Sequence, residues 1–281
     1  MNVSGDEPHR VLVDGRAAEA VGVFDRGLHY GDGLFETIAI RDGAAPLWDR
    51  HWQRLCNGCT RLGIAPPHGE VLRDELAQVA GGAPRAVVKI IVTRGAGGRG
   101  YAPPGDVRPT RILLRYGWPE YPAAHWTNGV QVRFCRASLG RNAQLAGLKH
   151  LNRIEQVLAR SEWQDPAIAE GLMCDEQGKV IEATACNVFA FAGGMLRTPD
   201  LSACGVAGVM RELIIELAAG AGLETRVEPL SREKLLAADS VFLTNSLIGV
   251  WPVRKIEEHQ FGIDGTIREL AAKANCVLRG E

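Results

Sequence analysis

Two consecutive β-hairpins in the second half of the chain constrain its fold more than any other feature of the sequence. The first is predicted at 171–182, with its turn at 175–178. The second is predicted at 187–196, with its turn at 192–194. Glycine-containing turns between strand-forming runs are typical of hairpins, which pair antiparallel strands. We therefore expect two pairs of antiparallel strands in this half of the chain.

The first half of the chain is predicted to combine strands with amphipathic helices. Apolar or alternating runs predict three strands, at 35–40, 86–93 and 111–116. Asp49 is expected to cap a helix that ends at Gly63, and a second helix is expected at 69–80. Together these elements favour an α+β fold.

A stretch rich in proline and aromatic residues, 117–122, is the best candidate for a linker. A chain of 281 residues is long enough for two domains. We therefore predict a smaller N-terminal α+β domain at 1–116, the interdomain linker at 117–122 and a larger C-terminal domain at 123–281.

The overall composition argues against several classes of protein. Lysine plus arginine total 32 and aspartate plus glutamate 33, so no excess of positive charge indicates nucleic acid as a partner. No apolar run approaches the roughly 20 residues that span a membrane, and residues 1–10 lack the apolar core of a signal peptide. A cytoplasmic location is therefore expected. The seven cysteines do not suggest disulfides, and no metal site is predicted, because Cys56 and Cys59 have no second pair of ligands.

The stretch 139–153 runs from a polar, glycine-containing loop towards a predicted helix, with Lys149 just before that helix. Leucines flank the lysine, and burial disfavours its charged form, so its amine is a candidate nucleophile towards an aldehyde. A lysine near a helix start is more often a solvated charge. A catalytic role for Lys149 therefore requires partner residues elsewhere in the chain. The sequence suggests no partner for Arg141 or Asn152. The following helix is expected to bury four apolar residues: Leu151, Ile154, Val157 and Leu158.

Three further segments carry polar groups suited to a ligand. Glu182 ends a strand among apolar neighbours, so its carboxylate either reaches solvent at a sheet edge or has a cationic partner. In 204–211, glycines precede a helix whose first N–H groups, at Val209 and Met210, form an anion site; an ordinary helix start is the alternative. Asn245 ends a late strand, where polar groups often face a site.

Two glycine-rich loops carry weaker candidates. The loop that contains Arg94 and Arg99 is not predicted to bind nucleotide, because two prolines follow it and cannot open a long helix. Its arginines are expected to pair with substrate carboxylates. The segment 24–37 carries His29 and Tyr30, and polar, aromatic loops of this kind often line sites. The alternative interpretation is a well-packed long connection.

A lysine, a carboxylate, an arginine and a helix start form the set that pyridoxal 5'-phosphate requires. Over nearly its whole length the sequence resembles the fold-type IV pyridoxal-phosphate enzymes, which include branched-chain and D-amino-acid aminotransferases and 4-amino-4-deoxychorismate lyases. The matching patterns are His51-x-x-Arg54-Leu55, Lys149, Glu182-x-x-x-x-Asn187-x-Phe189 and Gly208-Val209-Met210-Arg211. This resemblance implies a smaller N-terminal α/β domain and a larger C-terminal domain with a β-barrel-like sheet flanked by helices.

The resemblance also implies roles for single residues. Lys149 would be the Schiff-base lysine and catalytic residue, Arg54 would bind the phosphate, and Glu182 would hold the pyridine nitrogen. The other cofactor-binding residues would be Asn187, Val209, Met210 and Ser246. The substrate-binding candidates are His29, Tyr30, Arg94, Arg99, Asn245 and Leu247.

Within this family, 93–101 and 139–156 resemble the aminodeoxychorismate lyases. That resemblance implies conversion of 4-amino-4-deoxychorismate to 4-aminobenzoate and pyruvate in folate biosynthesis, by a homodimer. The segment 35–37 is closer to the aminotransferases, so an aminotransferase for D- or branched-chain amino acids is the alternative. A further alternative is a protein that binds pyridoxal phosphate without catalysing a reaction, or one that binds no cofactor.

Overall fold

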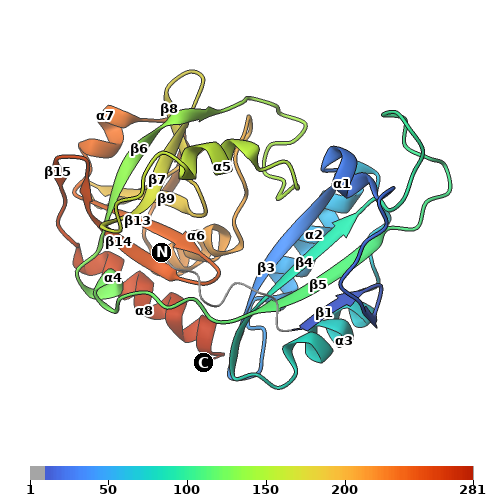
Figure 1. Ribbon diagram of the computed structural model, residues 1–281. Helices are drawn as coiled ribbons and strands as arrows, with labels where there is room; N and C mark the ends of the chain where they lie inside the picture. The colour runs from blue at the N-terminus through green and yellow to red at the C-terminus, as the bar shows by residue number, and fades with distance from the viewer. Residues whose placement is uncertain (1–9, 281) are drawn as a thin grey trace. The chain divides into compact units, whose positions relative to one another are not determined.

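The computed structural model describes residues 10–280, and the chain divides into two compact units (Figure 1). The N-terminal unit comprises the chain up to Pro119 together with the short segment Leu148–Asn152. The C-terminal unit comprises Glu120–Gly147 and the chain from Arg153 onward. The linker predicted at 117–122 would divide the chain once. In the structure the chain also returns to the first unit at Leu148–Asn152.

The N-terminal unit is built on a five-stranded antiparallel sheet with the order β2-β1-β5-β4-β3. Its strands are β1 (Arg10–Val13), β2 (Arg16–Ala17), β3 (Gly33–Arg41), β4 (Arg85–Thr93) and β5 (Thr110–Tyr116). Its helices are α1 (Arg26–Tyr30), α2 (Trp48–Leu62) and α3 (Gly69–Ala80). The three predicted strands and the predicted helix at 69–80 are confirmed.

The two faces of this sheet have different surroundings. Glu36, Ile90 and Leu113 lie side by side in register on β3, β4 and β5, and each is at most 1% exposed. Helices α2 and α3 pack against β3 and β5 and bury this face. Successive side chains of a strand alternate between faces, so the opposite face carries half-buried neighbours on the same strands: Phe35, Thr37, Lys89, Ile91, Ile112 and Leu114.

Helix α2 begins differently from the prediction, and Asp49 is not its cap. Leu47 occupies the cap position with its backbone already turning (φ −101°, ψ 20°), and no side chain caps the helix. Asp49 lies instead in the first turn, where its negative charge still favours the helix dipole. The predicted end of the helix is confirmed, because Gly63 terminates it in the left-handed conformation (φ 63°).

The segment Leu148–Asn152 covers the outer edge of β3, the last strand in the sheet order. The backbone N–H of Phe35 donates to the carbonyl of Lys149 at 2.9 Å, and the N–H of Leu151 donates to the carbonyl of Gly33 at 3.0 Å. A strand edge offers such unpaired backbone groups. The backbone of the candidate lysine is therefore held by β3, five residues before the next helix begins.

The C-terminal unit contains a ten-stranded mixed sheet with the order β11-β10-β9-β13-β14-β6-β7-β8-β12, in which β15 pairs with β14. Strand β12 contacts β10 near the other end of this order, so the sheet curls into a nearly closed barrel (Figure 1). The α+β fold class predicted from the sequence is confirmed. The strands are β6 (Val130–Leu139), β7 (Ile168–Asp175), β8 (Lys179–Ala183), β9 (Asn187–Ala192), β10 (Met195–Pro199), β11 (Thr225–Glu228), β12 (Leu230–Ser231), β13 (Ser240–Asn245), β14 (Gly249–Ile256) and β15 (His259–Gln260).

Both predicted hairpins are present in this sheet. Strands β7 and β8 pair antiparallel, and the N–H of Gly178 closes their turn on the carbonyl of Asp175 at 2.9 Å. Strands β9 and β10 form the second hairpin. The helices of this unit are α4 (Ala124–Thr127), α5 (Ile154–Arg160), α6 (Val209–Gly220), α7 (Arg232–Leu236) and α8 (Gly265–Arg279).

The prediction that the helix after Lys149 buries Leu151, Ile154, Val157 and Leu158 is wrong. Leu151 is half-buried and lies before the first residue of α5. Ile154, Val157 and Leu158 are 65%, 60% and 56% exposed. The helix instead buries Gln156 and Ala159, which lie three positions apart. The small side chain of Ala159 lets this two-turn helix pack closely on β6 and β7.

Two features are absent from the part of the chain that the structure describes. No helix between residues 10 and 280 is long and apolar enough to cross a membrane. Within the same range, no group of three or more histidine, cysteine, aspartate or glutamate side chains could hold a metal ion.

Candidate active site

The side chain of Lys149 lies against the ring of Phe35. Its Nζ is 4.2 Å from the ring centroid, and the lysine is half-buried. Phe35 belongs to the sheet face opposite α2 and α3. A lysine amine over an aromatic face is held by the ring as well as by its own backbone, so β3 determines where the amine of Lys149 lies.

Lys89 of β4 is a second cation beside the same ring, with its Nζ 5.2 Å from the centroid of Phe35. Burial lowers the pKa of this lysine. In the part of the chain that the structure describes, Lys89 forms no hydrogen bond or ion pair. Sequence reasoning missed this residue, although a lysine inside the apolar run 86–93 was a visible signal.

Arg54 of α2 is held by a buried carboxylate, that of Glu36 in β3. The Nε of Arg54 donates to Oε1 at 2.8 Å, and its Nη2 donates to Oε2. The Nδ1 of His51 is 2.6 Å from the same Oε2. His51 and Arg54 are three positions apart and therefore share one face of α2, so both reach Glu36.

The surroundings determine the charges of this Glu36 cluster. Burial alone would raise the pKa of Glu36, but the charge of Arg54 and the hydrogen bonds from His51 and Arg54 lower it to about 2. Burial lowers the pKa of His51, so its ring is neutral and donates through Nδ1. The Nε2 of His51 is buried without a hydrogen-bond partner among residues 10–280. The cluster therefore combines one negative and one positive charge.

Glu36 is the second residue that the sequence analysis missed. It stands within the alternating strand 35–40, in phase with the buried Leu34 and Ile38. A buried carboxylate requires a cation or several donors. That rule, applied to Glu36, would have pointed to the arginine on the next helix.

In the C-terminal unit, Glu182 and Asn187 hold the two backbone groups of Val206. Glu182, which is 4% exposed, accepts a hydrogen bond from the N–H of Val206 at 2.8 Å. The Nδ2 of Asn187 donates to the carbonyl of Val206 at 2.9 Å. The alternative in which Glu182 reaches solvent at a sheet edge does not hold, since its side chain is buried.

Helix α6 begins directly after this segment and has no side-chain cap. The first N–H groups of a helix, here those of Val209 and Met210, have no acceptor within the helix, and the helix dipole makes them attractive to an anion. Glycine is required at the cap position, because a Cβ on Gly208 would lie 2.0 Å from Oδ1 of Asn187. This helix start is therefore an anion-binding geometry beside Asn187.

The end of strand β13 folds into a turn around Asn245. Its Oδ1 accepts hydrogen bonds from the N–H groups of Leu247 and Ile248, at 2.9 and 3.0 Å. Its Nδ2 donates to the carbonyl of Ala185 at 3.1 Å. The side chain of Asn245 thus shapes the turn that carries Ser246 and Leu247, both of which are half-buried.

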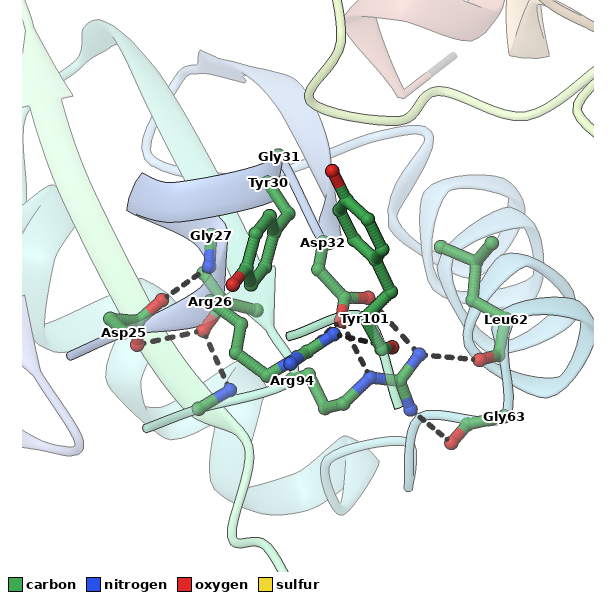
Figure 2. A network of polar contacts seen from close by, with 12 residues as sticks. Asp25, Arg26, Gly27, Tyr30, Gly31, Asp32, Leu62, Gly63, Arg94 and Tyr101 are labelled. Atoms are coloured by element: carbon green, nitrogen blue, oxygen red, sulfur yellow. Dashed lines mark hydrogen bonds and ion pairs between the residues drawn. The ribbon is translucent and has the colours of Figure 1, made fainter. Parts of the chain in front are cut away.

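Arg94 anchors the glycine-rich loop (Figure 2). Its Nε and Nη2 bond the two carboxylate oxygens of Asp32 at 2.7 and 3.0 Å. It also donates to the carbonyls of Leu62 and Gly63, at the end of α2, at 2.7 and 2.8 Å. This geometry favours an anchoring role for Arg94 over the substrate contact expected from the sequence.

Arg26 completes the anchor from the other side of Asp32 (Figure 2). Its Nε donates to Asp32 at 2.8 Å, and its Nη1 and Nη2 donate to the carbonyls of Gly100 and Tyr101 at 3.0 and 3.1 Å. The ring of Tyr30 lies 4.8 Å from the guanidinium of Arg26, and its hydroxyl accepts from the N–H of Gly100 at 3.2 Å. Tyr30 is thus part of the contact that holds this loop.

The other two loop candidates differ in their surroundings. His29 contacts the carbonyl of Val23 through Nε2 at 2.6 Å. Arg99 is exposed and forms no hydrogen bond or ion pair with any described residue. Of the two arginines on this loop, Arg99 is therefore the one whose charge is available to a ligand.

Both polar residues that had no expected partner have one in the structure. Arg141 donates to Oδ2 of Asp175 at 2.5 Å. Asn152 donates to the carbonyl of Gly31 at 3.1 Å. Each bond fixes one flank of the stretch that contains Lys149.

The predicted site residues are distributed over both units. The N-terminal unit contains His29, Tyr30, Arg54, Arg94, Arg99 and Lys149. The C-terminal unit contains Glu182, Asn187, Val209, Met210, Asn245, Ser246 and Leu247. Within the second unit, the structure brings Glu182, Asn187 and the start of α6 together around Val206.

Comparison with known proteins places the chain in a family. The profile of the family described as "Amino-transferase class IV" matches residues 33–256. The chain belongs to this family.

Individual relatives narrow the comparison. Aminodeoxychorismate lyase of Vibrio harveyi is 36% identical over 261 residues, which is 93% of this chain and 96% of the relative. A crystal structure of 4-amino-4-deoxychorismate lyase from Pseudomonas aeruginosa is 47% identical, with a TM-score of 0.92, covering 96% of this chain and 99% of the other. A crystal structure of Escherichia coli branched-chain amino acid aminotransferase, at 24% identity and a TM-score of 0.88 over 98% of this chain and 96% of the other, shares the fold.

Proposed function

We propose that the protein is a pyridoxal-phosphate-dependent lyase that converts 4-amino-4-deoxychorismate to 4-aminobenzoate and pyruvate. The observation that carries this proposal is the similarity to the Pseudomonas aeruginosa lyase, at 47% identity over almost the whole of both chains. The half-buried amine of Lys149, the buried Glu182 and the uncapped start of α6 support it.

The residues present fit this cofactor. The start of α6 offers N–H donors to a phosphate, and Gly208 keeps the backbone free of a side chain there. Glu182 is a buried carboxylate suited to a pyridine nitrogen. When bound, pyridoxal phosphate supplies an electron sink for a carbanion next to the substrate nitrogen.

We assign the following actions to the chain's own residues. Lys149 holds the cofactor through Nζ, and the same amine in its neutral form removes the proton from the substrate carbon that bears nitrogen. Glu182 holds a proton on the pyridine nitrogen, and Arg54 binds the phosphate together with the N–H groups of Val209 and Met210. The bond between the ring carbon and the ether oxygen breaks, and the enolpyruvyl group leaves and is protonated to pyruvate. Because this loss leaves an aromatic ring, the protein mainly has to orient groups and move protons. Asn187 and Ser246 complete the cofactor-binding set.

For the two substrate carboxylates we propose Lys89 and Arg99. Lys89 lies beside the same ring as Lys149 and has no carboxylate partner among the described residues. Arg99 is exposed on the anchored loop. The single variants Lys89→Met and Arg99→Gln are each expected to raise KM for the substrate without loss of cofactor.

The second candidate function is an aminotransferase. A putative branched-chain aminotransferase of Methanocaldococcus jannaschii is 30% identical over 252 residues, 88% of this chain and 85% of the relative, and the segment 35–37 resembles those enzymes. The two activities differ in whether a keto acid is needed. Purified protein with aminodeoxychorismate and no keto acid is expected to release 4-aminobenzoate and pyruvate. Absence of both products, together with amino transfer to 2-oxoglutarate, would refute the lyase proposal.

A cofactor test separates either enzyme from a protein that does not use Lys149. Reconstituted wild type is expected to show an absorbance band near the visible edge, and Lys149→Ala is expected to lose that band and the activity. A colourless reconstituted wild type would contradict the cofactor assignment. The homodimer and the cytoplasmic location expected from the sequence stay predictions; light scattering would test the first against the 30.4-kDa mass of one chain.

A further inference from the structure

Glu36 and Arg54 form an ion pair that the proposed reaction does not itself require. One whole edge of the guanidinium, Nε and Nη2, faces the two carboxylate oxygens. The side chains are 2% and 16% exposed, so water and salt screen the pair poorly. A phosphate bound by Arg54 would therefore approach a guanidinium that already carries an anion.

The charge of the arginine is compensated within the Glu36 cluster. His51 is neutral, so one carboxylate and one guanidinium leave no net charge. A phosphate ester carries about 1.5 to 2 negative charges at neutral pH. It would bind close to a second, buried anion, and like charges repel strongly where hydration is poor.

We propose that Glu36 is an internal counter-ion for Arg54, which stabilises the folded chain and weakens the binding of a phosphate group by the same arginine. This inference rests on the proposed function, in which Arg54 binds the cofactor phosphate. Glu36 does not touch the phosphate; it acts through Arg54 and sets how tightly the site holds a phosphate ester.

The consequence is a pair of effects with opposite sign. Replacing Glu36 with glutamine removes a buried countercharge, so the folded chain loses stability. The same change removes a like charge next to the bound anion, so phosphate binds more tightly. A residue with a purely structural role would change both quantities in one direction, because a destabilised site binds its ligand less well.

The chain offers a matched control in the same unit. Glu75 of α3 is 6% exposed, and its two carboxylate oxygens pair with Arg111 at 2.7 and 3.1 Å. Glu75→Gln therefore breaks a buried arginine–glutamate pair of the same geometry, away from Arg54. It is expected to lower stability without changing phosphate binding.

The experiment compares the full chain as wild type, Glu36→Gln and Glu75→Gln. Titration calorimetry measures the affinity for inorganic phosphate, absorbance titration measures the affinity for pyridoxal phosphate relative to pyridoxal, and urea unfolding measures stability. Glu36→Gln is expected to bind inorganic phosphate about tenfold more tightly than wild type, with a similar gain in the preference for pyridoxal phosphate over pyridoxal. Both variants are expected to unfold at lower urea.

Each other outcome has a defined meaning. Unchanged or weaker phosphate binding by Glu36→Gln would overturn the inference, while a wild type that prefers pyridoxal phosphate to pyridoxal would still support the cofactor assignment. A wild type that binds neither compound would overturn both. If Glu36→Gln does not fold in phosphate-free buffer, inorganic phosphate is expected to restore its folding where chloride at equal ionic strength does not; no recovery would overturn the inference.

Discussion

Asn187 leaves no room for a side chain at Gly208, the residue that precedes α6. A Cβ there would lie 2.0 Å from the amide oxygen, while the amide nitrogen holds the carbonyl of Val206. The backbone of Gly208 has φ −73°, which any residue can adopt. The requirement for glycine is therefore one of space and not of backbone conformation.

Gly208→Ala is expected to lower the free energy of unfolding by roughly 1–3 kcal/mol, because the new methyl group must displace the side chain of Asn187. Urea unfolding measures the change. Gly265→Ala is the control, since this glycine lies at the start of α8, directly after its cap Asp264, and its added Cβ meets nothing from the rest of the chain within 4 Å. Combining Gly208→Ala with Asn187→Ala is expected to cost less than the sum of the single changes; full additivity would contradict the steric explanation.

The low pKa of Glu36 predicts a loss of stability in acid. Its ordinary pKa is 4.5 and the folded chain lowers it to about 2, so the unfolded state takes up the proton first as pH falls. The stabilisation is complete above about pH 4.5 and is lost between there and pH 2, on the order of 3 kcal/mol. His51 acts in the same direction below its ordinary pKa of 6.5, because burial lowers its pKa as well.

Unfolding of wild type and Glu36→Gln at a series of pH values tests whether Glu36 loses its stabilising contribution in acid. Their difference in unfolding free energy is expected to be constant above about pH 5 and to shrink below it. A difference that stays constant down to pH 3 would show that the carboxylate of Glu36 does not contribute as an anion.

Single residues were predictable where a motif gave their type and spacing. The pattern of His51 and Arg54 on one helix face, and the spacing of Glu182 and Asn187, pointed to side chains that the structure places on shared partners. Glu36 was not predicted, because its importance comes from burial against another element, and a run of sequence does not show which element covers a strand.

At the scale of elements, the Arg26–Asp32–Arg94 cluster joins α1, the end of α2 and the glycine-rich loop. One carboxylate balances two arginines that are 5% and 12% exposed. The arginines use their other donors on backbone carbonyls of Leu62, Gly63, Gly100 and Tyr101. The loop that carries Arg99 is therefore held at both ends by charge-assisted hydrogen bonds.

Asp32→Asn is expected to lower the free energy of unfolding by about 3 kcal/mol, because it leaves two poorly hydrated arginines without a countercharge. Trypsin cleavage after Arg99 is expected to become faster as the loop loosens. Asp49→Asn is the control: its ion pair with Arg73 is exposed, at 92% and 63%, and its charge favours the helix dipole only weakly, so a loss of less than about 1 kcal/mol is expected. Equal stability of the two variants would argue against the anchoring role.

Elements followed the sequence where periodicity and turn residues agreed, as in the two hairpins and in the helix that Gly63 ends. The helix after Lys149 did not, because apolar spacing identifies a face without showing whether that face is buried. The prediction that Asp49 caps α2 was wrong for a related reason: Asp49 is a good cap residue, but the chain starts to turn two residues earlier. The pairing of Leu148–Asn152 with β3 is a long-range contact that no local pattern contains.

At the scale of the whole molecule, the functional proposal rests on similarity over the full chain and not on one motif. The Pseudomonas aeruginosa lyase is 47% identical over 96% of this chain, whereas the Escherichia coli branched-chain aminotransferase, which covers 98% of it, is 24% identical and shares the fold. The two candidate activities, lyase and aminotransferase, differ in the fate of the substrate's amino nitrogen. A lyase leaves that nitrogen on the aromatic product, and an aminotransferase transfers it to a keto acid.

The most direct test uses aminodeoxychorismate labelled at its amino nitrogen, incubated with the protein and 2-oxoglutarate. Mass spectrometry then locates the label. The lyase proposal predicts labelled 4-aminobenzoate, an equal amount of pyruvate and no labelled glutamate, with all products absent for Lys149→Ala. Labelled glutamate without 4-aminobenzoate would contradict it.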